Sequence, residues 1–241
     1  MDPITIVILT GIISTVGAAA ILGAAGYSPR AMRWVKRWFW GTKFVVLGPS
    51  ESGKTSFYNF LRHDQFADSF PTQSTLHVTE FNPFLVNKGG DFKLDISKGF
   101  DVPGDLEPQK QAEIAIREAP ETLILWTSLT DVNAKEWLAS FCLYLNRTLL
   151  ENRRLAKRLK SLTIVMNKSD EASTTIIDQR TKDFESVVSN TLGPALGDNV
   201  DRVSILSCTL LKTKGGEKAA NNVLLTIANS LIKAKPLARQ R

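Results

Sequence analysis

A short glycine-containing stretch has the residue types and spacing of a phosphate-binding loop. From Gly48 to Thr55 it fits the pattern Gly-x-x-x-x-Gly-Lys-[Ser/Thr]. The apolar run 44–47 predicts a buried strand before the loop, and residues 56–62 predict a helix after it. Backbone N–H groups between a strand and a helix can surround a phosphate, and the helix dipole adds positive potential. The predicted nucleotide contacts here are Gly48, Ser50, Glu51, Ser52, Gly53, Lys54, Thr55 and Ser56.

Within this loop, Lys54 is expected to reach the β- and γ-phosphates, and the Thr55 hydroxyl to bind Mg²⁺. A second motif, Asp-x-x-Gly at Asp101 to Gly104, follows an alternating apolar segment. Its aspartate would hold Mg²⁺, usually through water, and the Gly104 N–H would meet the γ-phosphate. The predicted metal ligands are therefore Thr55, Asp101 and a switch-loop threonine that is considered below.

A third motif, Asn167-Lys168-Ser169-Asp170, follows the apolar run 162–166, which predicts another buried strand. The carboxylate of Asp170 can accept two hydrogen bonds, and guanine offers two matching donors at N1 and N2. Adenine has no such pair of donors. The three motifs together predict binding of a guanine nucleotide with Mg²⁺.

In this order, each at the end of a predicted strand, the motifs resemble those of the Ras-like GTPases. Within them the chain is similar to the Arf and signal-recognition-particle receptor β-subunit branch. Glu51 to Thr55, the Thr-Gln-Ser-Thr of Thr72 to Thr75, and an apolar segment before the nucleotide domain all resemble the receptor β subunit. The resemblance covers about residues 41–233, but only the three nucleotide motifs are specific. It implies a Ras-like P-loop α/β fold, with a mostly parallel central sheet, helices on both faces, and GTP or GDP as ligand.

The resemblance also implies roles for two further loops. A Ras-like protein keeps a threonine after the phosphate helix that closes over Mg²⁺ and the γ-phosphate. Thr72, which follows a proline as in Arf proteins, is the first choice, and Thr75 is the second. The family offers N–H groups to guanine O6 from a Ser-Ala-Lys loop, which here is Ser207-Cys208-Thr209, so Ser207 carries over only weakly. The predicted base contacts are Asn167, Lys168, Asp170, Ser207 and Cys208.

One position departs from the family pattern. The water-positioning glutamine would follow Gly104 directly, and this position holds Asp105. Ras itself turns over at about 10⁻⁴ s⁻¹ unaided, and an aspartate is shorter and negatively charged beside an anionic centre. We therefore expect robust binding and very slow unaided hydrolysis. The alternative is that Asp105 only caps a helix beginning at Leu106. The predicted catalytic residues are Lys54, Thr72, Gly104 and Asp105.

The first residues predict a membrane anchor. Ile4 to Tyr27 contains no charged side chain, and as a helix it would span a hydrocarbon core of about 30 Å. A cleaved signal peptide normally has positive charge before its apolar run, whereas here only Asp2 precedes it. Basic residues follow the run, which places the next domain in the cytoplasm. The alternatives are a signal peptide or a buried helix. The membrane would be the endoplasmic reticulum in a eukaryote and the plasma membrane in a prokaryote.

The sequence thus divides into an anchor (4–27), a basic and aromatic juxtamembrane segment (28–41), a GTP-binding domain (42–233) and a basic tail (234–241). The chain has 241 residues and a formal charge of +6. Much of the excess charge lies beside the apolar run and in the tail, so it favours anionic lipid over nucleic acid. The two cysteines give no disulfide framework and are typical of a reducing compartment.

Periodicity predicts the remaining elements coarsely. We expect a strand over 76–84, one long helix over 134–160 with a basic end, and a helix over 174–192 that Gly193 and Pro194 terminate. The basic end of the long helix is either a solvated face or a surface for a partner or lipid.

Three functions fit these residues. The first is a GTPase switch whose protein partner binds the switch loops and completes the active site. The second is a GTP-loaded membrane receptor or scaffold without useful turnover. The third is an unrelated prokaryotic nucleotide domain tethered to the plasma membrane.

Overall fold

The computed structural model describes residues 42–63, 77–81, 84–87, 93–196, 203–210 and 215–233. Several sequence predictions lie outside the described residues: the anchor over 4–27, the juxtamembrane segment 28–41, Thr72, Thr75 and the tail over 234–241. Within the part that the structure describes, no helix combines the length and apolar character that a membrane span requires.

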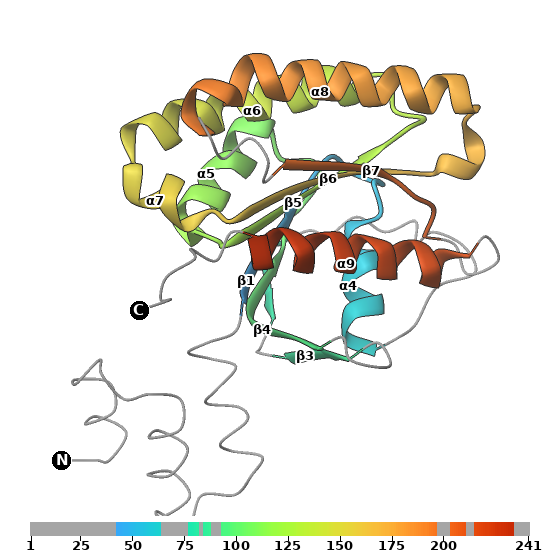
Figure 1. The fold of residues 1–241 in the computed structure, drawn as a ribbon, viewed down its shortest axis with the longest axis horizontal. Helices are drawn as coiled ribbons and strands as arrows, with labels where there is room; N and C mark the ends of the chain where they lie inside the picture. The colour runs from blue at the N-terminus through green and yellow to red at the C-terminus, as the bar shows by residue number, and fades with distance from the viewer. Residues whose placement is uncertain are drawn as a thin grey trace, which may run out of the picture.

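A seven-stranded sheet runs through the middle of the domain (Figure 1). Its strand order is β2-β4-β1-β5-β6-β7, and β3 also pairs with β4. Neighbours among β4, β1, β5, β6 and β7 are parallel, whereas β2 and β3 run antiparallel to β4. The expected mostly parallel sheet is confirmed. The strands are β1 (Thr42–Leu47), β2 (Thr79–Phe81), β3 (Phe84–Asn87), β4 (Lys93–Asp101), β5 (Thr122–Ser128), β6 (Ser161–Asn167) and β7 (Val203–Ser207).

Helices cover both faces of the sheet, as the resemblance implied (Figure 1). Along β1, Phe44 and Val46 point to one core, and Val45 and Leu47 point to the other, because successive side chains of a strand alternate between faces. The first core is shared with α4 (Lys54–His63) and α9 (Gly216–Lys233). The second is shared with α5 (Pro108–Glu118), α6 (Ala134–Glu151), α7 (Arg153–Arg158) and α8 (Thr174–Leu196).

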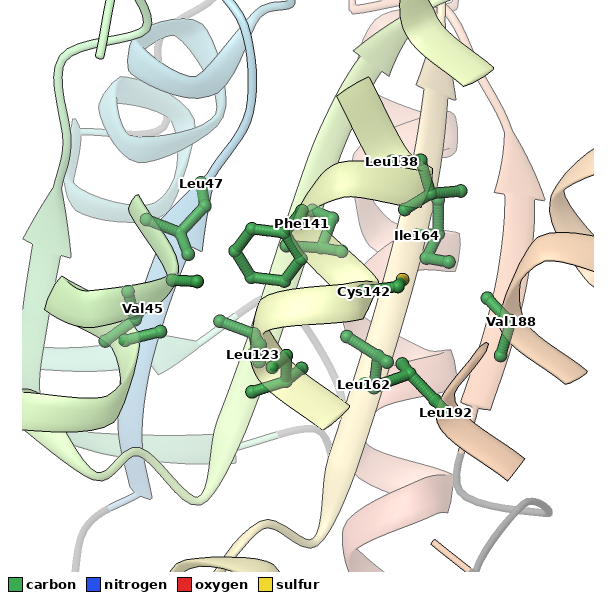
Figure 2. Packing of buried hydrophobic residues seen from close by; sticks show 14 of the residues in the cluster. Val45, Leu47, Leu123, Leu138, Phe141, Cys142, Leu162, Ile164, Val188 and Leu192 are labelled. Carbon is green, nitrogen blue, oxygen red and sulfur yellow. The ribbon is translucent and has the colours of Figure 1, made fainter. Parts of the chain in front are cut away.

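The larger core forms where α6 lies across the central strands (Figure 2). Every residue of β5 and of β6 is buried, as expected for parallel strands covered on both sides. From α6, Leu138, Phe141 and Cys142 are fully buried against this surface. The central strands, whose ends carry the motifs, are therefore held rigidly from both faces.

The helix predicted over 134–160 was wrong in one respect, because it is broken at Asn152. Asn152 has φ −122° and ψ 82°, outside the helical region, and it ends α6 and begins α7 at once. Its side chain accepts a hydrogen bond from the Leu155 N–H at 3.2 Å, which satisfies one donor of the new helix. The break lets Leu155 and Leu159 turn into the core.

Two other boundaries also differ from the sequence prediction. Helix α8 continues through Pro194 to Leu196, where Leu192 and Leu196 are both buried. Burial of these side chains opposes the loss of one helical hydrogen bond at the proline. The strand expected over 76–84 is described as β2 and β3, which share one antiparallel register on β4 and extend to Asn87.

We predict that Phe141→Ala lowers the free energy of unfolding by about 3–5 kcal/mol, because it empties a fully buried aromatic site. Phe141 also stacks on Trp137 with ring centroids 5.4 Å apart. Urea denaturation of the two proteins measures the change. Leu143→Ala on the same helix is the control: this side chain is 60% exposed, so its removal should cost less than about 0.5 kcal/mol. Equal losses from both variants would contradict the assigned core.

Candidate functional site

The three sequence motifs meet at one edge of the sheet. Each follows the carboxyl end of a parallel strand: the phosphate loop follows β1, the Asp-x-x-Gly motif closes β4, and Asn167 ends β6. In open α/β sheets this edge is where ligands bind. Residues far apart in the sequence therefore become neighbours.

The phosphate loop packs directly on the backbone of β5. A Cβ atom added at Gly48 would lie 1.9 Å from the Trp126 carbonyl oxygen, so no other residue fits there without moving the strand. Gly48 and Gly53 both have positive φ, at 145° and 104°. Glu51 lies between them with φ 60°, in the left-handed region, and its side chain is exposed. The chain therefore curls tightly between β1 and α4.

Lys54 and Thr55 begin α4 beneath this loop. The Lys54 Nζ donates to the carbonyl oxygens of Gly48 at 2.9 Å and Pro49 at 2.8 Å. Burial lowers the pKa of Lys54 to about 8, against the opposing effects of Asp101 and Asp105. The Thr55 hydroxyl donates to the Asp101 carboxylate at 3.0 Å. The two predicted magnesium ligands are thus adjacent, and their hydroxyl and carboxylate oxygens are of the kind that Mg²⁺ prefers.

Gly104 lies against the phosphate loop. A Cβ atom at this position would lie 2.4 Å from the Ser50 nitrogen, so the glycine is needed for the approach of the two loops. Asp105, the next residue, is exposed. The alternative role for Asp105 was wrong, because α5 begins at Pro108 and its N-cap is Glu107, without a side-chain cap.

Asn167 connects the third motif to the phosphate loop. It is fully buried, and its amide nitrogen donates to the Ser52 carbonyl oxygen at 3.0 Å. A Cβ atom at Gly53 would lie 2.4 Å from the same nitrogen. Next to it, Lys168 has a left-handed backbone with φ 62° and leads into the 3₁₀ turn Ser169–Glu171, where Asp170 is exposed. The carboxylate thus projects from a short turn beside the loop.

The loop after β7 differs in detail from the expected arrangement. Ser207 is exposed at the end of the strand, whereas the Cys208 side chain is buried with its sulfur 4.0 Å from the Asn167 Oδ1. The Cys208 N–H donates to the Met166 carbonyl oxygen at 2.9 Å, and the Cys208 carbonyl accepts from the Ser169 N–H at 3.0 Å. In this geometry Cys208 joins the loop to the Asn167 motif, and its role toward a base stays a prediction.

Gln111 is a residue of the site that the sequence analysis missed. Its side chain is fully buried, and its Oε1 accepts from the Gly48 N–H at 2.9 Å. Its Nε2 donates to the Gly48 carbonyl at 3.2 Å and to the Leu106 carbonyl at 3.0 Å. One amide therefore fastens α5, and the loop that carries Gly104 and Asp105, to the first glycine of the phosphate loop.

These features fit a polyphosphate ligand and one Mg²⁺. The loop offers a close-packed glycine backbone and a buried lysine, and Thr55 and Asp101 offer two oxygens. Among the described residues no group of three or more histidine, cysteine or acidic side chains could hold a metal on its own. That is expected of Mg²⁺, which typically takes one or two protein ligands and completes its shell with phosphate oxygens and water.

Comparison with known proteins relates the chain to others through its fold. No protein-family model matches the sequence, and no curated protein matches it either. A similar solved structure is translation elongation factor SelB from Methanococcus maripaludis, in complex with the GTP analogue GppNHp. The TM-score is 0.51 and the sequence identity is 16%; the match covers 78% of this chain and 34% of the elongation factor chain. This chain therefore spans about a third of that protein, and the two share the fold of a P-loop GTPase domain.

We predict that Gln111→Met lowers the free energy of unfolding by about 1–3 kcal/mol, since the buried Gly48 N–H would lose its acceptor and the Gly48 carbonyl would keep only the Lys54 Nζ as donor. Methionine keeps the length of the side chain, so lost packing contributes little. Urea denaturation is the measurement. The control is Gln109→Met, because Gln109 is exposed on the same helix and should change stability by less than about 0.5 kcal/mol. A Gln111 variant as stable as the control would show that the clamp carries no stability.

Proposed function

We propose that this chain is a membrane-anchored guanine-nucleotide-binding protein of the small-GTPase type. It binds GTP and GDP with Mg²⁺ and acts as a switch or receptor subunit. The shared fold with a GTPase domain supports a nucleotide function. The structure of that elongation factor holds a GTP analogue, which supports the choice of nucleotide. The anchor is supported by the charge-free run from Ile4 to Tyr27.

The observation that carries the proposal is the convergence of three separate motifs. The Thr55 hydroxyl lies 3.0 Å from the Asp101 carboxylate, and the Asn167 amide lies 3.0 Å from the Ser52 carbonyl. The first contact joins the phosphate-loop motif to the aspartate predicted to hold Mg²⁺, and the second joins it to the motif predicted to read the base. If one motif were only part of the local structure, the other two would not be expected to contact it.

Each residue of the site has a proposed role toward the nucleotide or Mg²⁺. Lys54 turns from the loop carbonyls toward the β- and γ-phosphates, where its charge is matched. Thr55 and Asp101 hold Mg²⁺, directly or through water, and the ion when bound neutralises charge on the phosphates. The Gly104 N–H meets the γ-phosphate, and Asp170 accepts from guanine. Thr72, or Thr75 in its place, would close over Mg²⁺ and the γ-phosphate.

Asp105 decides between a switch and a scaffold. Its carboxylate is exposed beside Gly104, at the position from which a glutamine would orient water. A negative charge there opposes the γ-phosphate and supplies no donor to it. Turnover therefore depends on a protein partner at the switch loops, and the competing function is a GTP-loaded scaffold that recruits a partner without significant turnover. Phosphate release with and without candidate partners separates the two.

We predict that the purified chain retains GTP or GDP and that ATP competes poorly, because adenine cannot satisfy Asp170. Asp170→Asn should weaken guanine nucleotide binding by about 2–5 kcal/mol and shift preference toward xanthine nucleotides. Competition binding with GTP, GDP, ATP and xanthosine triphosphate is the measurement. Glu171→Gln, also exposed in the same turn, is the matched control and should leave selectivity unchanged. Equal competition by ATP and GTP in the unmodified chain would refute the nucleotide assignment.

We predict that Asp105→Gln raises the rate of unaided GTP hydrolysis while GTP affinity changes little. The repulsion is lost, and the longer amide can accept from water and donate to phosphate. Single-turnover hydrolysis with pre-loaded nucleotide measures the effect. Glu107→Gln removes a nearby exposed charge that makes no side-chain cap, so it controls for net charge alone. An unchanged rate in Asp105→Gln, or an equal rise in Glu107→Gln, would count against the mechanism.

A further inference from the structure

Helix α7 presents a strongly basic surface that the proposed nucleotide function does not use. Residues 152–160 read Asn-Arg-Arg-Leu-Ala-Lys-Arg-Leu-Lys, without an acidic side chain. Leu155 and Leu159 are buried in the larger core, so the helix is fixed to the domain by its apolar side. The side chains of Arg154, Lys157 and Arg158 are exposed.

The neighbouring basic groups are neutralised, but those of α7 are not. Lys160 pairs with Glu121 at 2.7 Å, and Lys43 pairs with Glu118 at 3.2 Å. By contrast, the exposed α7 side chains form no ion pair with an acidic residue in the part of the chain that the structure describes. Glu118 and Glu121 are thus already engaged by other lysines, whereas the side chains of Arg154, Lys157 and Arg158 are all exposed.

The position of α7 indicates what lies opposite this charge. The Lys160 N–H donates to the Glu121 carbonyl at 2.8 Å, and the Glu121 N–H donates to the Lys43 carbonyl at 3.1 Å. These contacts place Lys160, two residues after the end of α7, close to Lys43 at the start of β1. Figure 1 shows α7 at the edge where β5 and β6 begin, opposite to the edge that carries the motifs.

We infer that the α7 surface, formed by Arg154, Lys157 and Arg158, rests on anionic lipid headgroups next to the anchor. A tether at Thr42 keeps this end of the domain close to the bilayer, and cationic side chains are attracted to acidic phospholipids. The inference rests on the anchor part of the proposed function. Each basic side chain near an anionic surface contributes about 1 kcal/mol, or about fivefold in the ratio of docked to undocked domain.

The test uses the full chain in vesicles that contain a headgroup quencher. A fluorophore is attached through Lys157→Cys. The native Cys142 and Cys208 are buried, and burial raises the pKa of both thiols to about 12, so labelling is selective. Vesicles of phosphatidylcholine alone are compared with vesicles that also contain phosphatidylglycerol. Quenching should be strong only with the anionic lipid and should fall at about 0.5 M salt, where screening acts within about 4 Å.

Charge removal provides the decisive variant. Arg154→Gln with Arg158→Gln should lower the docked-to-undocked ratio by about 25-fold. The matched control removes two exposed charges elsewhere, Lys110→Gln with Lys182→Gln, and should retain quenching. A label at Val132→Cys, which is 76% exposed beyond β5 at the opposite edge, should stay unquenched.

The outcomes separate this surface from the proposed function. Equal quenching in neutral and anionic vesicles, no quenching at position 157, or equal quenching at position 132 would overturn the inference. An acidic protein as the true partner would give the second of these results. Flotation reports on the anchor: protein that floats only with anionic vesicles refutes the anchor and supports the α7 surface, and protein that floats with neither overturns both. Loss of GTP binding would leave quenching unchanged.

Discussion

The close contact between Gly48 and the backbone of β5 is the constraint on which the site depends. It brings the phosphate loop against a strand that is buried along its whole length, so the loop inherits the rigidity of the core. Gln111 then fixes the same glycine from α5, and Asn167 fixes Ser52 from β6. A loop held by three elements loses little conformational entropy when a ligand binds. The loop is in this sense preorganised.

Much of this arrangement could be predicted from the sequence, because the direction of the strands determines where the motifs lie. The apolar runs 44–47 and 162–166, which form most of β1 and β6, are continuous, and parallel strands must bring their carboxyl ends to one edge. The ends of the helices, by contrast, depend on small differences between competing interactions. Asn152 breaks a helix because its side chain caps the next one, and α8 passes Pro194 because Leu192 and Leu196 are buried. Such local competition between a cap, a proline and burial is not visible in periodicity.

The sequence could not reveal Gln111 for a related reason. A glutamine in an amphipathic helix usually lies on the solvated face, and only the approach of α5 to the phosphate loop makes this one a buried bidentate partner. The family resemblance assigns the loop of Cys208 to the base. In the structure the Cys208 N–H donates to the Met166 carbonyl oxygen beside β6, and the role of this residue toward a base stays a prediction. Residue type predicts which interactions a side chain can make, whereas tertiary packing determines with which neighbour it makes them.

Under the proposed function, the polarity of the sheet would connect nucleotide chemistry with the position of the domain at a membrane. Motifs at the carboxyl ends of the strands lie on the edge of the sheet opposite to the start of β1, where the proposed tether would join the domain. If α7 rests on headgroups, the phosphate loop and the Asp105 loop face away from the bilayer, where a soluble partner can reach them. Removing the charges of α7 would then change how often the site is presented to that partner, without changing the site itself. If both proposals hold, regulation by orientation at the membrane would be separable from regulation by the bound nucleotide.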